Sequence, residues 1–297
     1  NSDHATRQRL WKIRAKRVVL ATGALERPLV FNDNDRPGIM LSASMRKYLN
    51  QYGVSPGNKV LIFTNNDDAY RTALSLSENN VSIAAIVDLR NKPNGDLVKK
   101  ATEKRIVIFP GYAVVATSGH LRLNSVKIMK LNKQGTDVTG SAKNIPCDCI
   151  GMSGGWNPAV HLFSQSGGKL QWDNELDSFL PDSATQNLVS VGSCNGAQTL
   201  NLCIKEGLKV GAESARETNN KGRTPSAPKI LETKQTEKRT IWLIPGEKPL
   251  GRGGKHFVDF QNDVTAADIN LAAKEGYRSI EHLKRYTTIR SAELKKH

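Results

Sequence analysis

Residues 59–88 limit the possible folds more than any other stretch, because they predict two strands joined by a helix. Residues 59–63 and 81–87 are short apolar runs typical of buried strands. Between them, residues 67–78 carry apolar side chains at helical spacing. Strands joined by a crossover helix pair in parallel, so this unit predicts an α/β protein with a parallel sheet. Asp88 ends the second strand, where mononucleotide-binding units carry an acid.

The loop after the first of these strands departs from a phosphate-binding loop. Thr64, Asn66 and Ala69 occupy the three positions that would be glycine in G-x-G-x-x-G. The Cβ atoms of Thr64 and Asn66 would crowd a pyrophosphate, and Asp67 and Asp68 place negative charge where the anion would lie. These acids suit helix capping better. We therefore expect this half to keep the Rossmann shape without a pyrophosphate site.

Two other short strands end in glycine. Residues 18–21 predict a buried strand that breaks at Thr22 and Gly23, and residues 187–192 predict another that ends at Gly192. A helix is expected to follow from about residue 197 to 215. Glycine at such strand ends lets a ligand approach the backbone closely. The alternative in each case is an ordinary strand followed by a tight turn.

Other segments predict further elements. Ser42 is expected to cap a helix that runs through Leu49, and residues 105–131 are rich in strand patterns. Residues 240–245 form an apolar segment in a polar, basic stretch, and predict an anchor in a linker. Thr265 with Asp268 is a capping-box pattern, and Gly276 would end that helix.

Charge and cysteine content exclude several classes of protein. The net charge of +15 arises from residues 1–20, 216–256 and 274–297, which leaves the rest of the chain neutral overall. These basic segments have few aromatic side chains for base stacking, so we expect no nucleic-acid partner. The four cysteines form no C-x-x-C pair, so no metal site is predicted, and they suit a reducing cytosol. No apolar run approaches the length of a membrane span.

Four separated motifs together resemble one family. They are Ala21-Thr-Gly-Ala-Leu-Glu-Arg-Pro-Leu-Val-Phe-Asn-Asp-Asn-Asp-Arg-Pro-Gly38; Phe63-Thr-Asn-Asn-Asp-Asp-Ala-Tyr-Arg-Thr-Ala73; Ser153-Gly-Gly-Trp-Asn-Pro-Ala-Val-His161; and Phe257-Val-Asp-Phe-Gln-Asn-Asp-Val-Thr-Ala-Ala-Asp268 with Glu281-His-Leu-Lys-Arg-Tyr-Thr-Thr288. Their sequence and order resemble the α subunit of heterotetrameric sarcosine oxidase. The resemblance covers nearly the whole chain but only the middle of that longer subunit, so we expect a fragment truncated at both ends.

The resemblance implies a function for the complete enzyme. It would oxidise sarcosine to glycine with oxygen, form hydrogen peroxide and pass the one-carbon unit to tetrahydrofolate in the cytoplasm. The α subunit would hold noncovalent NAD, while FAD and FMN would belong mainly to the β subunit; γ and δ subunits complete the heterotetramer. This piece would contribute NAD contacts and assembly surface, without catalytic residues. We expect it to bind NAD weakly or not at all alone.

The resemblance also implies site residues. The residues facing NAD would be Thr22, Gly23 and Ala24 after the first glycine-ended strand, and Gly192, Ser193, Ala197 and Thr199 after the second. Their roles would be close backbone approach and N–H groups at a helix N-terminus. Ser193 stands where flavin-binding relatives have an aspartate, which is consistent with NAD there. Residues 258–262 lack the cysteines that related oxidoreductases use for an iron–sulfur cluster, so none is expected.

The implied fold is an FAD/NAD-binding, disulfide-reductase-like Rossmann-type domain with an inserted second nucleotide-type domain, followed by a small helical domain. We expect the first lobe in residues 1–40, the insert in 41–144, the return to the first domain in 145–216, a basic linker in 217–256 and the helical domain in 257–297. The alternatives are a free-standing FAD/NAD-dependent reductase, which needs an intact glycine-rich loop, and a non-catalytic basic scaffold.

Overall fold

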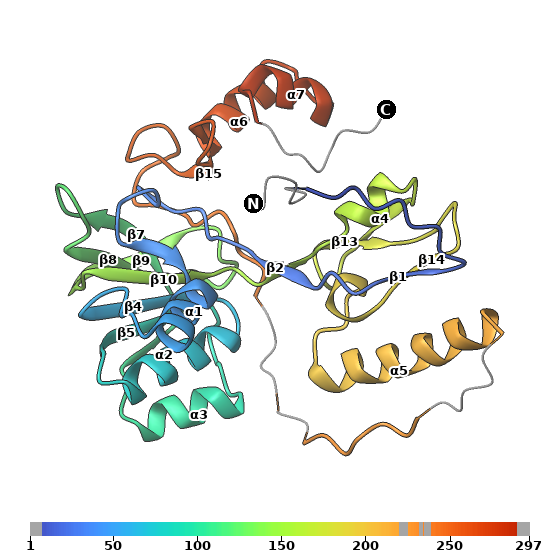
Figure 1. Cartoon of the computed structure of the whole chain (residues 1–297). Coiled ribbons are helices and arrows are strands. Elements are labelled where there is room, and N and C mark those ends of the chain that lie inside the picture. Colours follow the sequence, from blue (N-terminus) through green and yellow to red (C-terminus); the bar gives the residue numbers. More distant parts are fainter. Residues whose placement is uncertain (1–7, 220–224, 232–233, 235–238, 290–297) are drawn as a thin grey trace, which may run out of the picture. The chain divides into compact units, whose positions relative to one another are not determined.

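The computed structural model describes residues 8–219, 225–231, 234 and 239–289, and divides the chain into two compact units (Figure 1). Unit 1 comprises Asn1–Leu25 and Asn157–Leu231, and unit 2 comprises Glu26–Trp156 and Glu232–His297. Strands β2 (Ala24–Glu26) and β11 (Trp156–Pro158) pair where the chain passes between the units. The chain passes between the units at residues 25–26 and 156–157. We expected these passages at residues 40–41 and 144–145.

Unit 2 is built on a five-stranded parallel sheet in the order β3-β10-β4-β5-β6. The predicted βαβ unit is confirmed, because β4 and β5 pair in parallel and α2 connects them. The five strands are β3 (Ile39–Leu41), β10 (Cys149–Ser153), β4 (Lys59–Thr64), β5 (Ser82–Asp88) and β6 (Ile108–Pro110).

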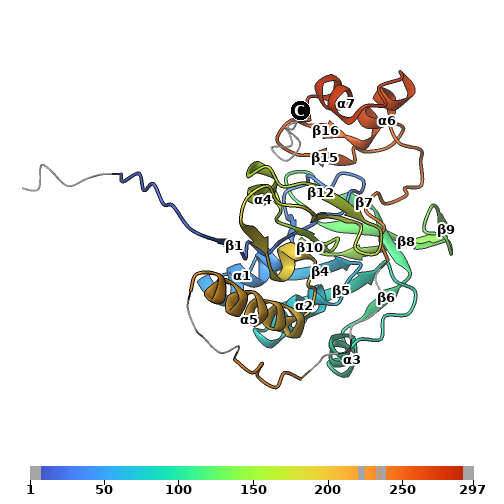
Figure 2. The same ribbon diagram turned by 90° about the vertical axis from the view of Figure 1, so that its right-hand side faces the viewer.

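Both faces of this sheet are covered. Val60 and Ile62 of β4 join a core with the helices α1 (Ser42–Tyr52), α2 (Asp68–Glu78) and α3 (Asp96–Glu103). Leu61 and Phe63 face the antiparallel sheet of β7 (Tyr112–Ser118), β8 (Ser125–Leu131) and β9 (Val138–Pro146). Figure 2 shows the helices and the antiparallel sheet beside the parallel strands. Burial on both faces explains why β4 is continuously apolar rather than alternating.

The helix α1 begins differently from the prediction. Ser42 is its first helical residue rather than its cap, and the preceding Leu41 makes no side-chain cap bond. The Glu26 carboxylate instead accepts from the backbone N–H of Ala43 at 2.8 Å. The predicted capping by Ser42 is therefore wrong, because a carboxylate distant in sequence satisfies the first turn.

Unit 1 has a smaller framework. The strands β1 (Val18–Leu20) and β14 (Leu188–Ser190) pair in parallel, and β12 (Leu170–Asp173) pairs with β13 (Ser178–Pro181) in antiparallel. Its helices are α4 (His161–Gln165), the 3-10 turn η1 (Gly192–Asn195) and α5 (Leu200–Glu217). Among the described side chains of α5, only Ala212 is buried, while Leu200 is 67% exposed. The apolar face predicted for this helix is thus only partly covered within unit 1.

Helix α5 starts three residues later than predicted. Gly196 has φ +87°, a left-handed conformation that interrupts the helix after η1, and the N–H of Ala197 bonds to Gly192 O at 3.2 Å. Thr199 is the N-cap, because its Oγ1 accepts from the Leu202 N–H at 3.3 Å. Ala197 therefore belongs to the turn between η1 and α5.

The C-terminal part of unit 2 contains β15 (Phe257–Asp259), β16 (Val264–Thr265), α6 (Ala266–Lys274) and α7 (Ile280–Thr287). The predicted capping box at Thr265 and Asp268 is confirmed. The buried carboxamide of Asn34 joins this part to the residues after β2: Nδ2 donates to Phe257 O at 2.9 Å, and Oδ1 accepts from Phe257 N–H at 2.8 Å.

The segment predicted as an anchor packs on unit 2. The N–H of Val30 donates to Trp242 O, and the N–H of Ile244 donates to Val30 O, both at 2.8 Å, and Ile244 is buried. The described residues contain no helix with the length and apolar character needed to span a bilayer.

Candidate functional site

The two predicted glycine-ended strands are neighbours in unit 1. β1 and β14 pair with Leu20 opposite Ser190, and the Val191 N–H donates to Leu20 O at 2.9 Å. Because the strands are parallel, residues 21–24 and 191–193 leave the sheet at the same end. We call these residues the unit 1 edge. Ligands of open α/β sheets bind outside the carboxyl ends of the strands, which is where this edge lies.

On the first side of the unit 1 edge, Gly23 is held by Ala159. The Thr22 hydroxyl donates to Ala159 O at 2.7 Å, and the Ala159 N–H donates to Gly23 O at 2.9 Å. Gly23 has φ +75°, and a Cβ added there would meet no atom within 4 Å. Glycine is therefore needed here for its backbone conformation, and the space beside it is open within the described structure.

On the second side, the turn η1 is organised around Gly192. Gly192 has φ +73°, and its N–H donates to Glu206 Oε2 of α5 at 2.8 Å. The Ser193 hydroxyl and the Cys203 sulfur lie 3.6 Å apart. The N–H group that we expected to face a cofactor is thus already paired with a carboxylate.

The first group of predicted site residues, five of the seven, lies at the unit 1 edge. Thr22, Gly23 and Ala24 are on one side of this edge, and Gly192 and Ser193 are on the other. Ala197 and Thr199 lie further on: Ala197 is buried with its N–H bonded, and the Thr199 side chain is occupied in capping α5. The cofactor-facing roles of all seven remain predictions, and the contacts favour the first group.

The sequence did not predict that Glu206 contacts the unit 1 edge. Glu206 follows Cys203 by three residues, so both lie on the same side of α5 near η1. An acid interrupting the apolar face of a predicted helix was the available signal, although its partner lies 14 residues earlier.

A cavity of about 240 Å³ lies elsewhere in unit 1. It is lined by residues before and within the two paired strands and by Leu162, Ser166 and Gln186, and by none of the seven predicted residues. This cavity is therefore separate from the unit 1 edge.

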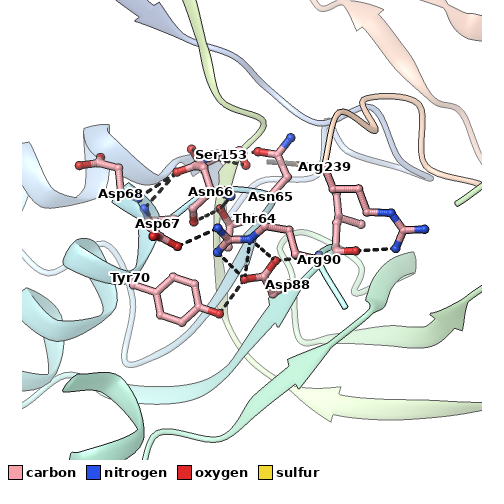
Figure 3. A network of polar contacts seen from close by, with 12 residues as sticks. Thr64, Asn65, Asn66, Asp67, Asp68, Tyr70, Asp88, Arg90, Ser153 and Arg239 are labelled. Atoms are coloured by element: carbon pink, nitrogen blue, oxygen red, sulfur yellow. Dashed lines mark hydrogen bonds and ion pairs between the residues drawn. The ribbon is translucent and has the colours of Figure 1, made fainter. Parts of the chain in front are cut away.

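Unit 2 also has a carboxyl edge, which consists of residues 64–68, 88–90 and 153–155. We call it the unit 2 edge. Asn66 occupies its centre (Figure 3). The Asn66 Oδ1 accepts from the N–H groups of Asp68 and Ala69 at 3.1 and 3.4 Å, and its Nδ2 donates to Ser153 Oγ at 2.9 Å. The amides that would bind a pyrophosphate are thus bonded to an asparagine side chain.

The acids next to Asn66 do not cap α2, contrary to our expectation. Asp67 is the N-cap residue by position but makes no side-chain cap bond. Its carboxylate instead accepts from Arg90 Nη1 at 2.7 Å, and Asp68 pairs with Arg46 at 2.9 Å. The acids are drawn away because buried or half-buried arginines compete for them, and Asn66 performs the capping.

Asp88, the acid at the end of β5, is fully buried and already engaged. Its Oδ2 accepts from Arg90 Nη2 and from the Tyr70 hydroxyl, both at 2.7 Å (Figure 3). Burial raises the pKa of Tyr70, and the neighbouring Asp88 raises it further. Burial alone would lower the pKa of Arg90, but Asp88 and Asp67 raise it above its ordinary value. Arg90 therefore stays charged and occupies the carboxylate that a ribose would need.

Glu26 is a half-buried carboxyl group of unit 2. Burial raises its pKa, while the Ser153 hydroxyl and the Ala43 N–H favour its charged form. Its Oε1 is buried and has no hydrogen-bond partner among the described residues. A buried acceptor left without a donor is costly when charged, which agrees with the direction of the pKa shift.

Cysteine and metal chemistry finds little support in the described residues. Burial raises the pKa of the Cys147 and Cys149 thiols to about 12, so both remain protonated near neutral pH. The described part of the chain holds no group of three or more His, Cys, Asp and Glu side chains arranged to bind a metal ion.

Comparison with solved structures shows the fold. The chain is similar to L-proline dehydrogenase from P. horikoshii with a TM-score of 0.62 and 19% identity, over 93% of this chain and 49% of that one. It is also similar to thioredoxin reductase from T. acidophilum, with a TM-score of 0.54 and 17% identity over 69% of this chain and 67% of that one. Together with the parallel sheet, these similarities confirm the predicted disulfide-reductase-like Rossmann-type fold.

Comparison of sequences gives a narrower result. Residues 253–293 match the Sarcosine oxidase A3 domain family. The chain is 37% identical over 292 residues to sarcosine oxidase subunit alpha of Corynebacterium sp. (strain P-1), covering 97% of this chain and 30% of that protein. It is equally identical to the subunit alpha of Rhizobium meliloti (strain 1021), of which it covers 27%. The chain is therefore a relative of the sarcosine oxidase alpha subunit along nearly all of its own length, aligned with less than a third of the length of that subunit.

Proposed function

We propose that this chain forms the dinucleotide-binding part of a sarcosine oxidase alpha subunit, with NAD at the unit 1 edge. The observation that carries the proposal is the pairing of two glycine-ended parallel strands, with open space beside Gly23. Thr22, Gly23 and Ala24 would form one wall of the site, and Gly192 and Ser193 the other. Gly192 would contribute its lack of a side chain rather than its N–H, which Glu206 occupies.

Unit 2 would have a different role. Its edge is filled by Asn66 and the Arg90 ion pairs, which supports a nucleotide-type domain retained for its shape. Ala197 and Thr199 would support the second wall of the NAD site by shaping the turn into α5. The expected domain order, with a first lobe, an insert, a return, a basic linker and a small helical domain, belongs to this proposal.

In the complete enzyme, the reaction would take place elsewhere. The proposal assigns FAD and FMN mainly to the β subunit, with γ and δ subunits completing a cytoplasmic heterotetramer. That assembly would demethylate sarcosine to glycine, reduce oxygen to hydrogen peroxide and pass the one-carbon unit to tetrahydrofolate. This chain would supply NAD contacts and assembly surface, and we assign it no catalytic residue.

Saturation-transfer NMR with NAD tests the site, because it detects weak complexes. The sequence left open whether the chain alone binds NAD weakly or not at all. The proposed site narrows this expectation to weak binding, because both glycine-ended strands and the space beside Gly23 are present in unit 1. Gly23→Val should abolish the transfer to NAD, because its Cβ branch would fill the open space and strain a left-handed residue. The measurement is the transfer to the NAD protons at matched protein concentration.

Gly140→Val is the matched control for this variant. Gly140 has φ +79° and also has no neighbour within 4 Å of an added Cβ, but it lies in β9 of unit 2. The two variants impose similar backbone strain, so they should lose similar stability, while Gly140→Val keeps NAD binding. Undiminished transfer to NAD in Gly23→Val, or none in the unchanged chain, would refute the placement of NAD at this edge.

A further inference from the structure

The side chain of Glu206, which lies in α5, places a carboxylate at the unit 1 edge. Its Oε2 is fixed by the Gly192 N–H at 2.8 Å, so one oxygen and the orientation of the carboxylate are set by the backbone of the turn. Its Oε1 makes no hydrogen bond among the described residues. Glu206 is half-buried, so its carboxylate is fixed in orientation and partly accessible to a ligand.

The chemistry of this oxygen limits what it can bind. An ionised carboxylate only accepts hydrogen bonds, so its partner must be a donor such as a hydroxyl group. Phosphate oxygens carry no such donor and would be repelled by the negative charge. None of the lysines and arginines that the structure describes forms an ion pair with Glu206, so this charge is not neutralised internally.

The neighbours of Glu206 are small and uncharged. The Ser193 hydroxyl lies 3.6 Å from the Cys203 sulfur, and a Cβ added to Gly192 would lie 3.8 Å from the same sulfur. The carboxylate is thus the strongest acceptor at this side of the edge. A sugar hydroxyl matches it better than a phosphate or an apolar group does.

We infer that Glu206 is a ligand-binding residue of this site, whose Oε1 accepts a hydrogen bond from a ribose hydroxyl of the dinucleotide. This inference rests on the proposed NAD site. Rossmann-type proteins more often bind the ribose with an acid at a strand end. Asp88 of unit 2 has that position, but Arg90 occupies its carboxylate, and we assign the role to Glu206 instead. Glu206 would thereby favour an unphosphorylated ribose.

The test compares Glu206→Gln and Glu206→Ala with the unchanged chain, by titration with NAD followed by saturation-transfer NMR. Loss of a charge-assisted hydrogen bond should weaken NAD binding about tenfold in Glu206→Gln, and by more in Glu206→Ala. Glu213→Gln is the matched control, because it removes the same charge from the same helix two turns later. Its NAD affinity should equal that of the unchanged chain.

Inorganic pyrophosphate, which has no hydroxyl group, separates a ribose contact from general damage to the site. Its binding, followed by phosphorus NMR, should be unchanged or stronger in the Glu206 variants, because a negative charge is lost. Equal weakening of NAD and pyrophosphate, or NAD affinity unchanged in Glu206→Ala, would overturn the inference while leaving the NAD site standing. Absence of NAD binding by the unchanged chain would instead refute the proposed function, and this inference with it.

Discussion

The two carboxyl edges of this protein have similar strand geometry and different chemistry. At the unit 2 edge, Asn66 bonds the amides of α2, and Arg90 forms ion pairs with Asp88 and Asp67. At the unit 1 edge, Gly23 borders open space, and Glu206 retains an oxygen without a partner in the described structure. The comparison shows that a Rossmann-type fold can be kept while the groups that would bind a ligand form hydrogen bonds and ion pairs within the protein. The fold alone therefore does not locate a binding site.

The largest expected effect comes from breaking the internal ion pairs of the unit 2 edge. Arg90→Ala would remove the guanidinium that pairs with the buried Asp88 and the half-buried Asp67, which should destabilise unit 2 by about 3–5 kcal/mol. The measurement is hydrogen exchange of the β5 peptide as urea is raised, because this reports on unit 2 alone.

Lys104→Ala provides the matched control, since it removes a cation from an exposed pair with Glu78. Exposed pairs contribute less than about 1 kcal/mol, so the β5 peptide should exchange nearly as in the unchanged protein. Equal effects of the two variants would show that the unit 2 edge is not held by its buried charges.

An intermediate effect is expected from Asn66→Ala. The variant removes both the cap of α2 and the bond to Ser153, which should cost about 1–2 kcal/mol in the stability of unit 2. Circular dichroism during urea unfolding measures the change. Asn50→Ala is the control: the side chain of this exposed asparagine accepts from the Ser75 hydroxyl, and its loss should cost less. A cost for Asn66→Ala no greater than that control would mean that solvent can replace its bonds.

The smallest effect should appear as a pH dependence. The pKa of Glu26 is raised in the folded chain above its ordinary value of 4.5, so the folded state holds the proton more tightly. Its contribution to stability is therefore present below that value and is lost as the pH rises through the folded pKa. Glu26→Gln should remove this decline, so the variant gains stability relative to the unchanged protein as the pH rises.

Urea unfolding at a series of pH values from 4 to 8 measures the difference, with Glu103→Gln on the exposed part of α3 as the baseline. A difference between Glu26→Gln and the unchanged protein that stays constant with pH would contradict the raised pKa of Glu26 in the folded chain.

The sequence predicted the framework better than the contacts within it. The apolar run of β4, the helix α2 and the second run at β5 were visible because burial on both sheet faces imposes a pattern. The neighbouring positions of Gly23 and Gly192 followed from the family resemblance. Local signals also identified the capping box at Thr265, whose partners lie three residues apart.

What could not be predicted depends on partners far apart in the sequence. Ser42 looked like a cap, but Glu26 reaches the same helix end from the preceding segment. Asp67 looked like a cap, but Arg90 draws its carboxylate away. The bond from Gly192 to Glu206 depends on the rotation of α5 about its own axis, which periodicity fixes only roughly.

The Asn34 carboxamide pairs with both backbone groups of Phe257, as a neighbouring strand would. A side chain thus acts as a joint between the parallel-sheet part of unit 2 and the region that matches the A3 domain. The neighbouring Asp33 adds two bonds to Lys255: its N–H donates to Lys255 O at 2.7 Å, and its Oδ1 accepts from the Lys255 N–H at 3.1 Å. Two adjacent residues thus fix the register of residues 255–257 against the segment after β2, so substitutions at positions 33 and 34 should shift the start of β15.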